Sequence, residues 1–245
     1  MHHLFLPLEQ FTPGSARILG GDHHHLAKVL RMRVGEALVL LDNQGNAFRA
    51  TLTEIGKQSS VAQIEESLDL CSEPPIPLIV AQAPGKSDKF EQVIQHGTEV
   101  GATAFLPLLT ERGVVSLPPD RAETKQERWQ QIAKGAAEQS HRLRIPQVHS
   151  PQAFRQWISH QTSETTLILH TDPALPTLTE HLSKLSSPFS FFTLAVGAEG
   201  GWSHMEVSQA QEANIPLVSL GKRILRTETA ALVALSQILY HIERR

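Results

Sequence analysis

Cysteine is almost absent from this chain, and its scarcity excludes two kinds of structure. Cys71 is the only cysteine among 245 residues. A single thiol cannot form an internal disulfide, and it cannot build a zinc site from several cysteines. We therefore expect no structural metal, and a cytoplasmic location is the default expectation.

Long apolar runs are also missing. The first residues lack the basic flank and apolar core of a signal peptide, and no run approaches the roughly 20 apolar residues of a membrane span. We therefore expect neither export nor a membrane partner. With 40% hydrophobic and 19% charged residues, the 245-residue chain is typical of a globular protein with one large or two ordinary domains.

An excess of positive charge is absent as well. The formal net charge of -3 argues against a protein that grips naked nucleic acid through a broad electrostatic field. The basic residues nevertheless form three local clusters: Lys28, Arg31 and Arg33; Arg142 and Arg144; Lys222, Arg223 and Arg226. Each cluster alone is compatible with a solvated surface or with phosphate contacts. With one tyrosine and three tryptophans, aromatic base stacking is expected to matter less than shape and phosphate contacts.

Familiar catalytic and phosphate-binding motifs are missing too. There is no GxxxxGK[ST] loop, no GxGxxG after the first strand of the α/β region, and no serine nucleophile elbow. The segment QAPGKSDKF has only one of the two glycines that a Walker-type site requires. The adjacent histidines His23 to His25 do not favour a metal site, because successive helical positions point about 100° apart.

The first seventy residues predict a small β-rich domain, a partly closed barrel. Strand-like runs alternate with turns, and Asn43 to Asn46 reads as a hairpin loop in which Gly45 supplies a positive φ. One helix is expected after a cap at Asp22, with Leu26, Val29 and Leu30 on its buried face.

A boundary follows this β-rich part. Three prolines between Cys71 and Pro77 break any regular element, so we divide the chain into domains 1–72 and 73–245. After the boundary, strand-like runs at 78–83, 104–109, 165–170, 191–196 and 215–220 alternate with helix-like segments, including 88–100 and 119–141. Ser87 or Asp88 is expected to cap the first of these helices. This alternation predicts an α/β domain with a parallel sheet covered on both faces.

The stretch from residue 191 to 242 contains the strongest indication of a ligand site. Two apolar runs each end in a glycine-bearing turn and each precede a helix-like segment, for which Ser203 with Glu206 and Thr227 provide caps. In open α/β sheets, ligands bind outside the carboxyl ends of the strands. We therefore predict a site between two adjacent turns at one edge of the sheet.

The two turn sequences, VGAEGGW and LGKRILRTETA, resemble those of the SPOUT methyltransferases, which use S-adenosylmethionine. More narrowly, the chain is similar to the family that methylates N3 of a uridine in small-subunit ribosomal RNA. The resemblance extends to HLAKVLRMRVGEALVLLDNQG, KSDKFEQVIQHGTEVGATAFLPLLTERGVV and ERWQQIAKGAAEQSHRLRIPQVH, and so covers nearly the whole chain. The chain departs from the family pattern at Ala198, where proline is usual, and at His96 and Gly135.

The resemblance implies a C-terminal SPOUT domain threaded as a trefoil knot, an N-terminal PUA-like barrel that contributes to RNA binding, and a homodimer. It also implies that S-adenosylmethionine binds in three loops. The cofactor residues carried over are Leu169, His170, Thr171, Gly197, Glu199, Gly200, Gly201, Leu220, Gly221, Ile224, Leu225, Thr229 and Ala230.

The implied reaction requires removal of the N3 proton and stabilisation of the charge that develops on the uracil oxygens. Arg226 is our candidate for the stabilising donor, because guanidinium is planar and always charged. Glu199 or Glu228 could act as the base. Each residue also has an ordinary structural alternative: for Glu228, stabilisation of the start of the last helix, and for Arg226, a salt bridge to one of these glutamates.

For the RNA, Arg31, Arg33 and Arg142 are the expected phosphate contacts, and the partner is the small ribosomal subunit or its RNA. Two alternative functions are weighed against this one. The chain could be a SPOUT methyltransferase for another RNA such as tRNA, or a non-catalytic RNA-binding assembly factor.

Overall fold

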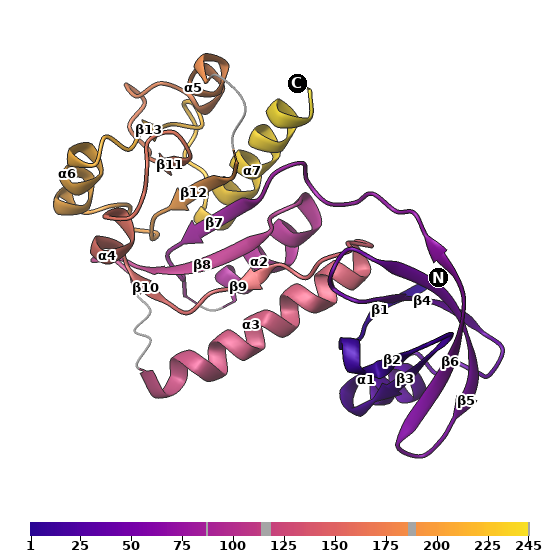
Figure 1. Cartoon of the computed structure of the whole chain (residues 1–245). Helices are drawn as coiled ribbons and strands as arrows, with labels where there is room; N and C mark the ends of the chain where they lie inside the picture. Colours follow the sequence, from indigo (N-terminus) through magenta and orange to yellow (C-terminus); the bar gives the residue numbers. More distant parts are fainter. Residues whose placement is uncertain (87, 114–118, 186–189, 245) are drawn as a thin grey trace. The chain divides into compact units, whose positions relative to one another are not determined.

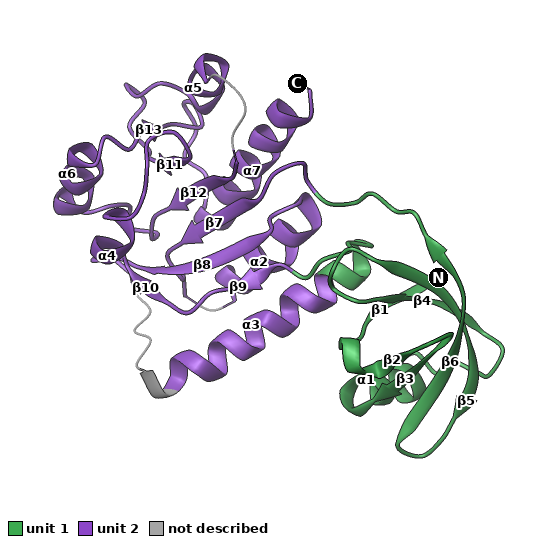
Figure 2. Ribbon diagram, in the orientation of Figure 1, with its two compact units in different colours: residues 1–73, 137–145 green, residues 74–136, 146–245 purple. Residues whose placement is uncertain are grey.

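The protein forms two compact units in a computed structural model that describes residues 1–86, 88–113, 119–185 and 190–244 (Figure 1). Unit 1 comprises Met1–Glu73 and Ala137–Ile145, and unit 2 comprises Pro74–Ala136 and Pro146–Arg245 (Figure 2). The sequence analysis placed every residue after 72 in the second domain. The structure differs, because the chain returns to unit 1 over residues 137–145.

Unit 1 is built on a six-stranded curled sheet in the order β1-β4-β5-β6-β3-β2. Neighbouring strands are antiparallel except for β1 and β4, which run parallel. The hairpin loop between β4 and β5 lies where predicted, and Asn43 and Gly45 both adopt positive φ. The strands are β1 (His2–Phe5), β2 (Phe11–Thr12), β3 (Ser15–Leu19), β4 (Ala37–Leu41), β5 (Ala47–Ile55) and β6 (Ser59–Leu68).

The helix of unit 1 differs from the prediction in its start and in its buried face. Helix α1 (Gly20–His24) begins two residues before Asp22, and no side chain caps it. The next turn, His25–Val29, is a π-turn, in which the amide of Leu30 donates to the carbonyl of His25 at 2.9 Å. This wider turn rotates the helical face, so that Val29 is 59% exposed while Leu26 is buried.

A returning segment completes the core of unit 1. Helix α3 (Pro119–Gln139) ends in this unit, where Ala137 and Leu143 join Phe5, Val39 and Leu41 in one apolar cluster. The side chain of Glu138 also accepts a hydrogen bond from the amide of Phe5 at 3.0 Å. No local signal within one long charged helix reveals that its last turn belongs to another unit.

Unit 2 is built on a seven-stranded parallel sheet, as the alternating pattern predicts. The main order is β10-β8-β7-β12-β11-β13, and β9 also pairs with β8. The short strands β9 and β10 were not predicted, since two-residue strands carry no periodicity. The strands are β7 (Leu78–Gln82), β8 (Ala104–Leu109), β9 (Gln147–Val148), β10 (Gln152–Ala153), β11 (Thr166–Leu169), β12 (Phe192–Val196) and β13 (Leu217–Val218).

The two faces of this sheet are covered by different helices. Helices α4 (Phe154–Ile158) and α6 (His204–Glu212) pack on the face that carries Leu106 and Leu108. Helices α2 (Lys89–Val100) and α7 (Thr227–Glu243) pack against each other, and α7 also contacts β12. Helix α5 (Leu178–Lys184) contacts α7. Among the described residues, no helix is both long enough and apolar enough to cross a membrane.

Four local expectations for unit 2 have different outcomes. The capping box of Ser203 and Glu206 at the start of α6 is confirmed. The expected cap at Thr227 is wrong, because Thr227 is the first helical residue of α7 and Arg226 takes the cap position with no side-chain hydrogen bond. The two glycine turns are not on adjacent strands either, since β11 lies between β12 and β13. Of the two caps proposed for α2, Asp88 takes the position, and Ser87 lies outside the described residues.

A stacked pair of histidines gives unit 1 a pH dependence. The rings of His3 and His141 lie 3.8 Å apart with an interplanar angle of 19°. Burial, together with the charge of the neighbouring His141, lowers the pKa of His3 from 6.5 to about 4. His3 is therefore neutral in the folded protein over a range in which an unfolded chain is protonated.

We expect this pair to destabilise the fold on acidification. Because the folded pKa lies below the unfolded one, the stabilising contribution is complete above pH 6.5 and is lost as the pH falls toward 4. After discounting for solvent screening, the loss is about 1–2 kcal/mol. Denaturant unfolding at several pH values should show a smaller loss for His3→Phe, which keeps the stacked ring. An unchanged loss in this variant would contradict the assignment.

Candidate functional site

A cavity of about 220 Å³ lies at the carboxyl ends of β11, β12 and β13. Three segments form its walls: the residues after β11, the glycine turn after β12 and the loop between β13 and α7. The loop residue Ile224 is 83% exposed although it is a large apolar side chain, so a ligand in the cavity could cover it. The lining residues are Leu169, His170, Thr171, Pro173, Val196, Gly197, Ala198, Gly201, Trp202, Leu220, Gly221, Lys222, Arg223, Ile224, Leu225, Thr227 and Ala230.

Trp202 fixes the shape of this cavity. Its indole is buried, and its Nε1 donates a hydrogen bond to the carbonyl of Leu169 at 2.8 Å, which joins two of the three walls. Gly197 lies directly against this ring, because a Cβ at Gly197 would stand 3.0 Å from Trp202 Cε2. Glycine at 197 is therefore needed for close approach, whereas Gly201 and Gly221 are needed for their positive φ of 71° and 97°.

The structure places most of the predicted cofactor residues in this cavity. The residues that line it are Leu169, His170, Thr171, Gly197, Gly201, Leu220, Gly221, Ile224, Leu225 and Ala230. The other three, Glu199, Gly200 and Thr229, do not line it. The sequence analysis did not predict Trp202 as a site residue, although Trp202 directly follows Gly200 and Gly201. Only turn glycines and polar groups were considered there, and not an aromatic side chain that supports the turn.

A cluster of charged side chains flanks the cavity. Lys89, the first residue of α2, places its Nζ 2.8 Å from Glu199 Oε1 and 3.8 Å from Glu228 Oε2. The hydroxyl of Thr227, a lining residue, donates to Glu228 Oε2 at 3.2 Å. The cluster is thus connected to the cavity through Thr227 and through the turn that carries Glu199. Lys89 was not among the predicted site residues, because a lysine in the first turn of a helix has no distinctive sequence signal.

The electrostatics of this cluster separate the roles of its members. The hydrogen bond and positive charge of Lys89 lower the pKa of Glu199, with smaller contributions from Lys86 and Arg226. A carboxylate with a lowered pKa accepts protons less readily, which disfavours Glu199 as a general base. The guanidinium of Arg226 is exposed and makes no ion pair or hydrogen bond with any described residue. The expected alternative of an Arg226–glutamate salt bridge is therefore not seen, since Lys89 pairs with both glutamates.

The basic residues expected to contact RNA fall into two groups. Arg31 and Arg33 are exposed in unit 1, on the segment after the π-turn. Arg142 is only 3% exposed and forms an ion pair with Glu73, which it contacts through both Nε and an NH2 group. The prediction for Arg142 is corrected accordingly, because a buried and paired guanidinium is not available to a phosphate.

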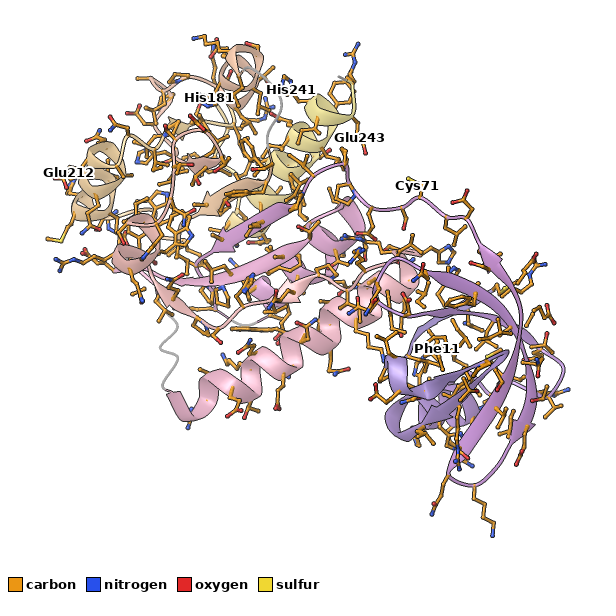
Figure 3. All side chains as sticks on the ribbon, in the orientation of Figure 1. Phe11, Cys71, His181, Glu212, His241 and Glu243 are labelled. Atoms are coloured by element: carbon orange, nitrogen blue, oxygen red, sulfur yellow. The ribbon has the colours of Figure 1, made fainter. Side chains whose placement is uncertain are left out.

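The remaining candidates for metal or thiol chemistry have ordinary surroundings. His23 is buried and its Nδ1 lies 2.9 Å from the hydroxyl of Ser60, while His24 and His25 are exposed. Cys71 is a free, exposed thiol in the segment after β6 (Figure 3). In the part of the chain that the structure describes, no group of three or more His, Cys, Asp or Glu side chains could hold a metal ion.

Taken together, a parallel α/β sheet with an apolar cavity at its carboxyl ends and a charged cluster beside it defines an enzyme domain that binds an organic ligand. Comparison with known proteins narrows this class. The sequence profile of the RNA methyltransferase domain matches residues 72–239, and that of the RNA methyltransferase PUA domain matches residues 19–65. The chain belongs to this RNA methyltransferase family, with a PUA-like first domain.

Individual relatives agree with this assignment. The chain is 39% identical to the ribosomal RNA small subunit methyltransferase E of Synechocystis, over 97% of this chain and 77% of the relative. Its identity to the Bacillus subtilis protein of the same name is 35%, over 92% and 90% of the two chains. The crystal structure of the Neisseria gonorrhoeae enzyme, bound to S-adenosyl methionine, superposes with a TM-score of 0.88 at 34% identity, covering 98% of this chain and 97% of that one.

Proposed function

We propose that this protein transfers the methyl group of S-adenosylmethionine to N3 of a uridine in small-subunit ribosomal RNA. We further propose that it acts on the assembled or partly assembled subunit, which would fit a chain with a net charge of -3. The observation that carries the proposal is the cavity beside β11, β12 and β13 with its charged flank, in a chain similar over 98% of its length to a relative whose crystal structure is bound to S-adenosyl methionine.

The residues of the cavity suit this cofactor. Leu169, Leu220 and Leu225 offer apolar side chains to the faces of an adenine ring, and the glycine turns leave backbone groups accessible to its edge. When bound, S-adenosylmethionine would supply a methyl group on a positively charged sulfur. The chain itself must hold the uridine in line with that methyl group and stabilise the uracil as N3 loses its proton.

Arg226 is the residue that we assign to this stabilisation. It precedes α7 directly, next to the lining residue Thr227, and its guanidinium has no competing ion pair among the described residues. Guanidinium can donate to a uracil oxygen as negative charge develops there. Glu228 stays the alternative candidate for the base, with Glu199 disfavoured by its lowered pKa.

Three further parts of the proposal concern assembly and RNA binding. The chain would thread unit 2 as a trefoil knot, associate as a homodimer, and use the PUA-like unit with Arg31 and Arg33 to contact RNA. The exposure of these two arginines supports the last part. Light scattering coupled to size exclusion should give twice the mass of one 27.0 kDa chain, and a monomer would contradict the dimer.

The function can be tested with small ribosomal subunits from a bacterial strain that lacks its own uridine-N3 methyltransferase. The purified protein and labelled cofactor should yield N3-methyluridine, detected by nucleoside mass spectrometry. Methylation of tRNA in place of these subunits would favour a different RNA substrate. Failure to bind S-adenosylmethionine by calorimetry would favour a non-catalytic RNA-binding assembly factor.

The cavity assignment makes a separate prediction at Gly197. In Gly197→Ala, the added methyl group would press on the indole of Trp202, which can move only by straining its hydrogen bond to Leu169. We expect the affinity for S-adenosylmethionine to fall roughly tenfold, or about 1.4 kcal/mol, by calorimetry. Gly135→Ala is the matched control, because a Cβ at this exposed position of α3 meets nothing within 4 Å. Equal affinities for the two variants would argue against the cavity.

A further inference from the structure

The surroundings of Lys89 point to a role beyond holding the fold together. Its side chain retains 29% of its accessible surface, so the ammonium is partly desolvated and still reachable. An ammonium has three donors. Glu199 Oε1 at 2.8 Å takes one of them, while Glu228 Oε2 at 3.8 Å is an ion-pair partner beyond hydrogen-bond distance. Donors therefore remain for a ligand beside the cavity.

Two helix N-termini meet at this place. Helix α2 begins at Lys89 and α7 begins at Thr227, and the two helices pack against each other. Their first turns carry unsatisfied backbone amides and a positive end of the helix dipole. Lys89 and Arg226 add two positive charges, Glu199 and Glu228 add two negative ones, and both glutamates are ion-paired to Lys89. The four side-chain charges cancel, so the two helix N-termini are what favours negative charge here.

A buried amide on β7, the strand next to β12, lacks a hydrogen-bond partner. Gln82, the last residue of β7, is fully buried, and neither its Oε1 nor its Nε2 has a hydrogen-bond partner. It pairs in register with Val196, which lines the cavity. Buried amides are normally satisfied, and an exception calls for an explanation. This unpartnered amide is separate from the charged cluster, and Gln82 itself does not line the cavity.

We propose that Lys89 is a second catalytic cation of the uracil site. Its ammonium donates to one of the two oxygens that flank N3, and Arg226 donates to the other; Glu199 and Glu228 are positioning residues that hold the ammonium in place. This inference rests on the proposed function. It also accounts for the selection of uracil over cytosine. Cytidine carries an amino donor in place of one of these oxygens, and the two cations would repel it.

In this inference water takes the place of Glu228 as the proton acceptor, and the step balances. The N3–H bond of uridine ionises and its proton passes to water, leaving an imide anion whose charge lies on N3 and both oxygens. The N3–C bond then forms as the C–S bond of the methyl donor breaks, and that electron pair stays on sulfur. Two cations at the oxygens lower the pKa of the imide and so increase the reactive fraction at neutral pH.

The test is the pH dependence of single-turnover methylation, with the small subunits described above and saturating S-adenosylmethionine. For the unaltered protein the rate should rise with pH and then level off. Lys89→Met should lower the rate at pH 7 about 100-fold and move the midpoint of this rise at least one pH unit upward. Lys89→Arg keeps the charge and should keep the midpoint near its original value.

Lys86→Met is the matched control. Lys86 stands in the same turn with the same charge, but its side chain is exposed and forms no ion pair with any described residue. In Lys86→Met, the midpoint of the rise of the methylation rate with pH should equal that of the unaltered protein. An unmoved midpoint in Lys89→Met, or an equal shift in Lys86→Met, would overturn the proposal. Lys89→Gln replaces Lys89→Met if the latter fails to fold, judged by its thermal transition and cofactor binding.

The outcome separates this inference from the proposed function. If the unaltered protein makes no N3-methyluridine, the proposed function fails. If it makes N3-methyluridine and the Lys89 variants lose rate at every pH without a midpoint shift, the function stands and Lys89 is a structural ion-pair partner only.

Discussion

Arg226→Ala should reduce methyl transfer by about 100- to 1000-fold and leave the affinity for S-adenosylmethionine within a few-fold of its original value. The reason is the position of Arg226, which precedes α7 next to the cavity but does not line it. Its guanidinium has no structural ion pair among the described residues, so its loss should cost little stability. Calorimetry and single-turnover methylation on small ribosomal subunits measure the two effects separately.

Two further variants define the role of the guanidinium. Arg226→Lys keeps the charge but loses the planar fork, so we expect an intermediate rate. Arg128→Ala is the control for the loss of an arginine, because the Arg128–Glu91 ion pair is on the surface, where such pairs contribute little. If Arg226→Ala abolished cofactor binding instead, Arg226 would be a cofactor ligand rather than a partner of the uracil.

Much of the architecture follows from periodicity in the sequence. The strand-like runs of unit 2 are strands of one parallel sheet, and the hairpin at Gly45 and the capping box at Ser203 lie where predicted. The errors arise where tertiary contacts outweigh local preference. The π-turn after His24 rotates a short helix, and residues 137–145 return to unit 1 because Ala137 and Leu143 complete its core.

The site was less predictable than the sheet, because charge partners are chosen in three dimensions. Sequence reasoning paired Arg226 with the glutamates as an alternative role, but Lys89, 110 or more residues away in the chain, takes that position. It also assigned Arg142 to RNA, since an exposed and a buried arginine look alike in sequence. Trp202 was missed for the same reason, because its role depends on a hydrogen bond to the carbonyl of Leu169, which lies on another strand.

Removing the carboxylate of Glu73 should be among the most destabilising single changes in unit 1. Glu73 Oε1 accepts hydrogen bonds from the amides of Leu143 at 2.9 Å and Arg144 at 3.2 Å, and the same carboxylate pairs with Arg142. Glu73→Ala takes the carboxylate from a guanidinium that is 3% exposed, at a cost of about 3–5 kcal/mol.

Removing the Arg142 guanidinium should destabilise the fold less than removing the Glu73 carboxylate. This difference tests whether burial of the guanidinium determines the loss of stability. In Arg142→Met, the Glu73 side chain keeps two amide donors and is 21% exposed, so water can solvate it, and we expect a loss of about 1–3 kcal/mol. Denaturant unfolding measures the loss in both variants.

The control is Glu66→Ala, which breaks the exposed Arg49–Glu66 pair of the same unit and should change the free energy of unfolding by less than about 0.5 kcal/mol. Equal costs for Glu73→Ala and Arg142→Met would mean that direct attraction between the two charges, rather than burial of the guanidinium, dominates. Arg142 would then stabilise the returning segment by holding Glu73, and the stability of unit 1 would depend on ionic strength.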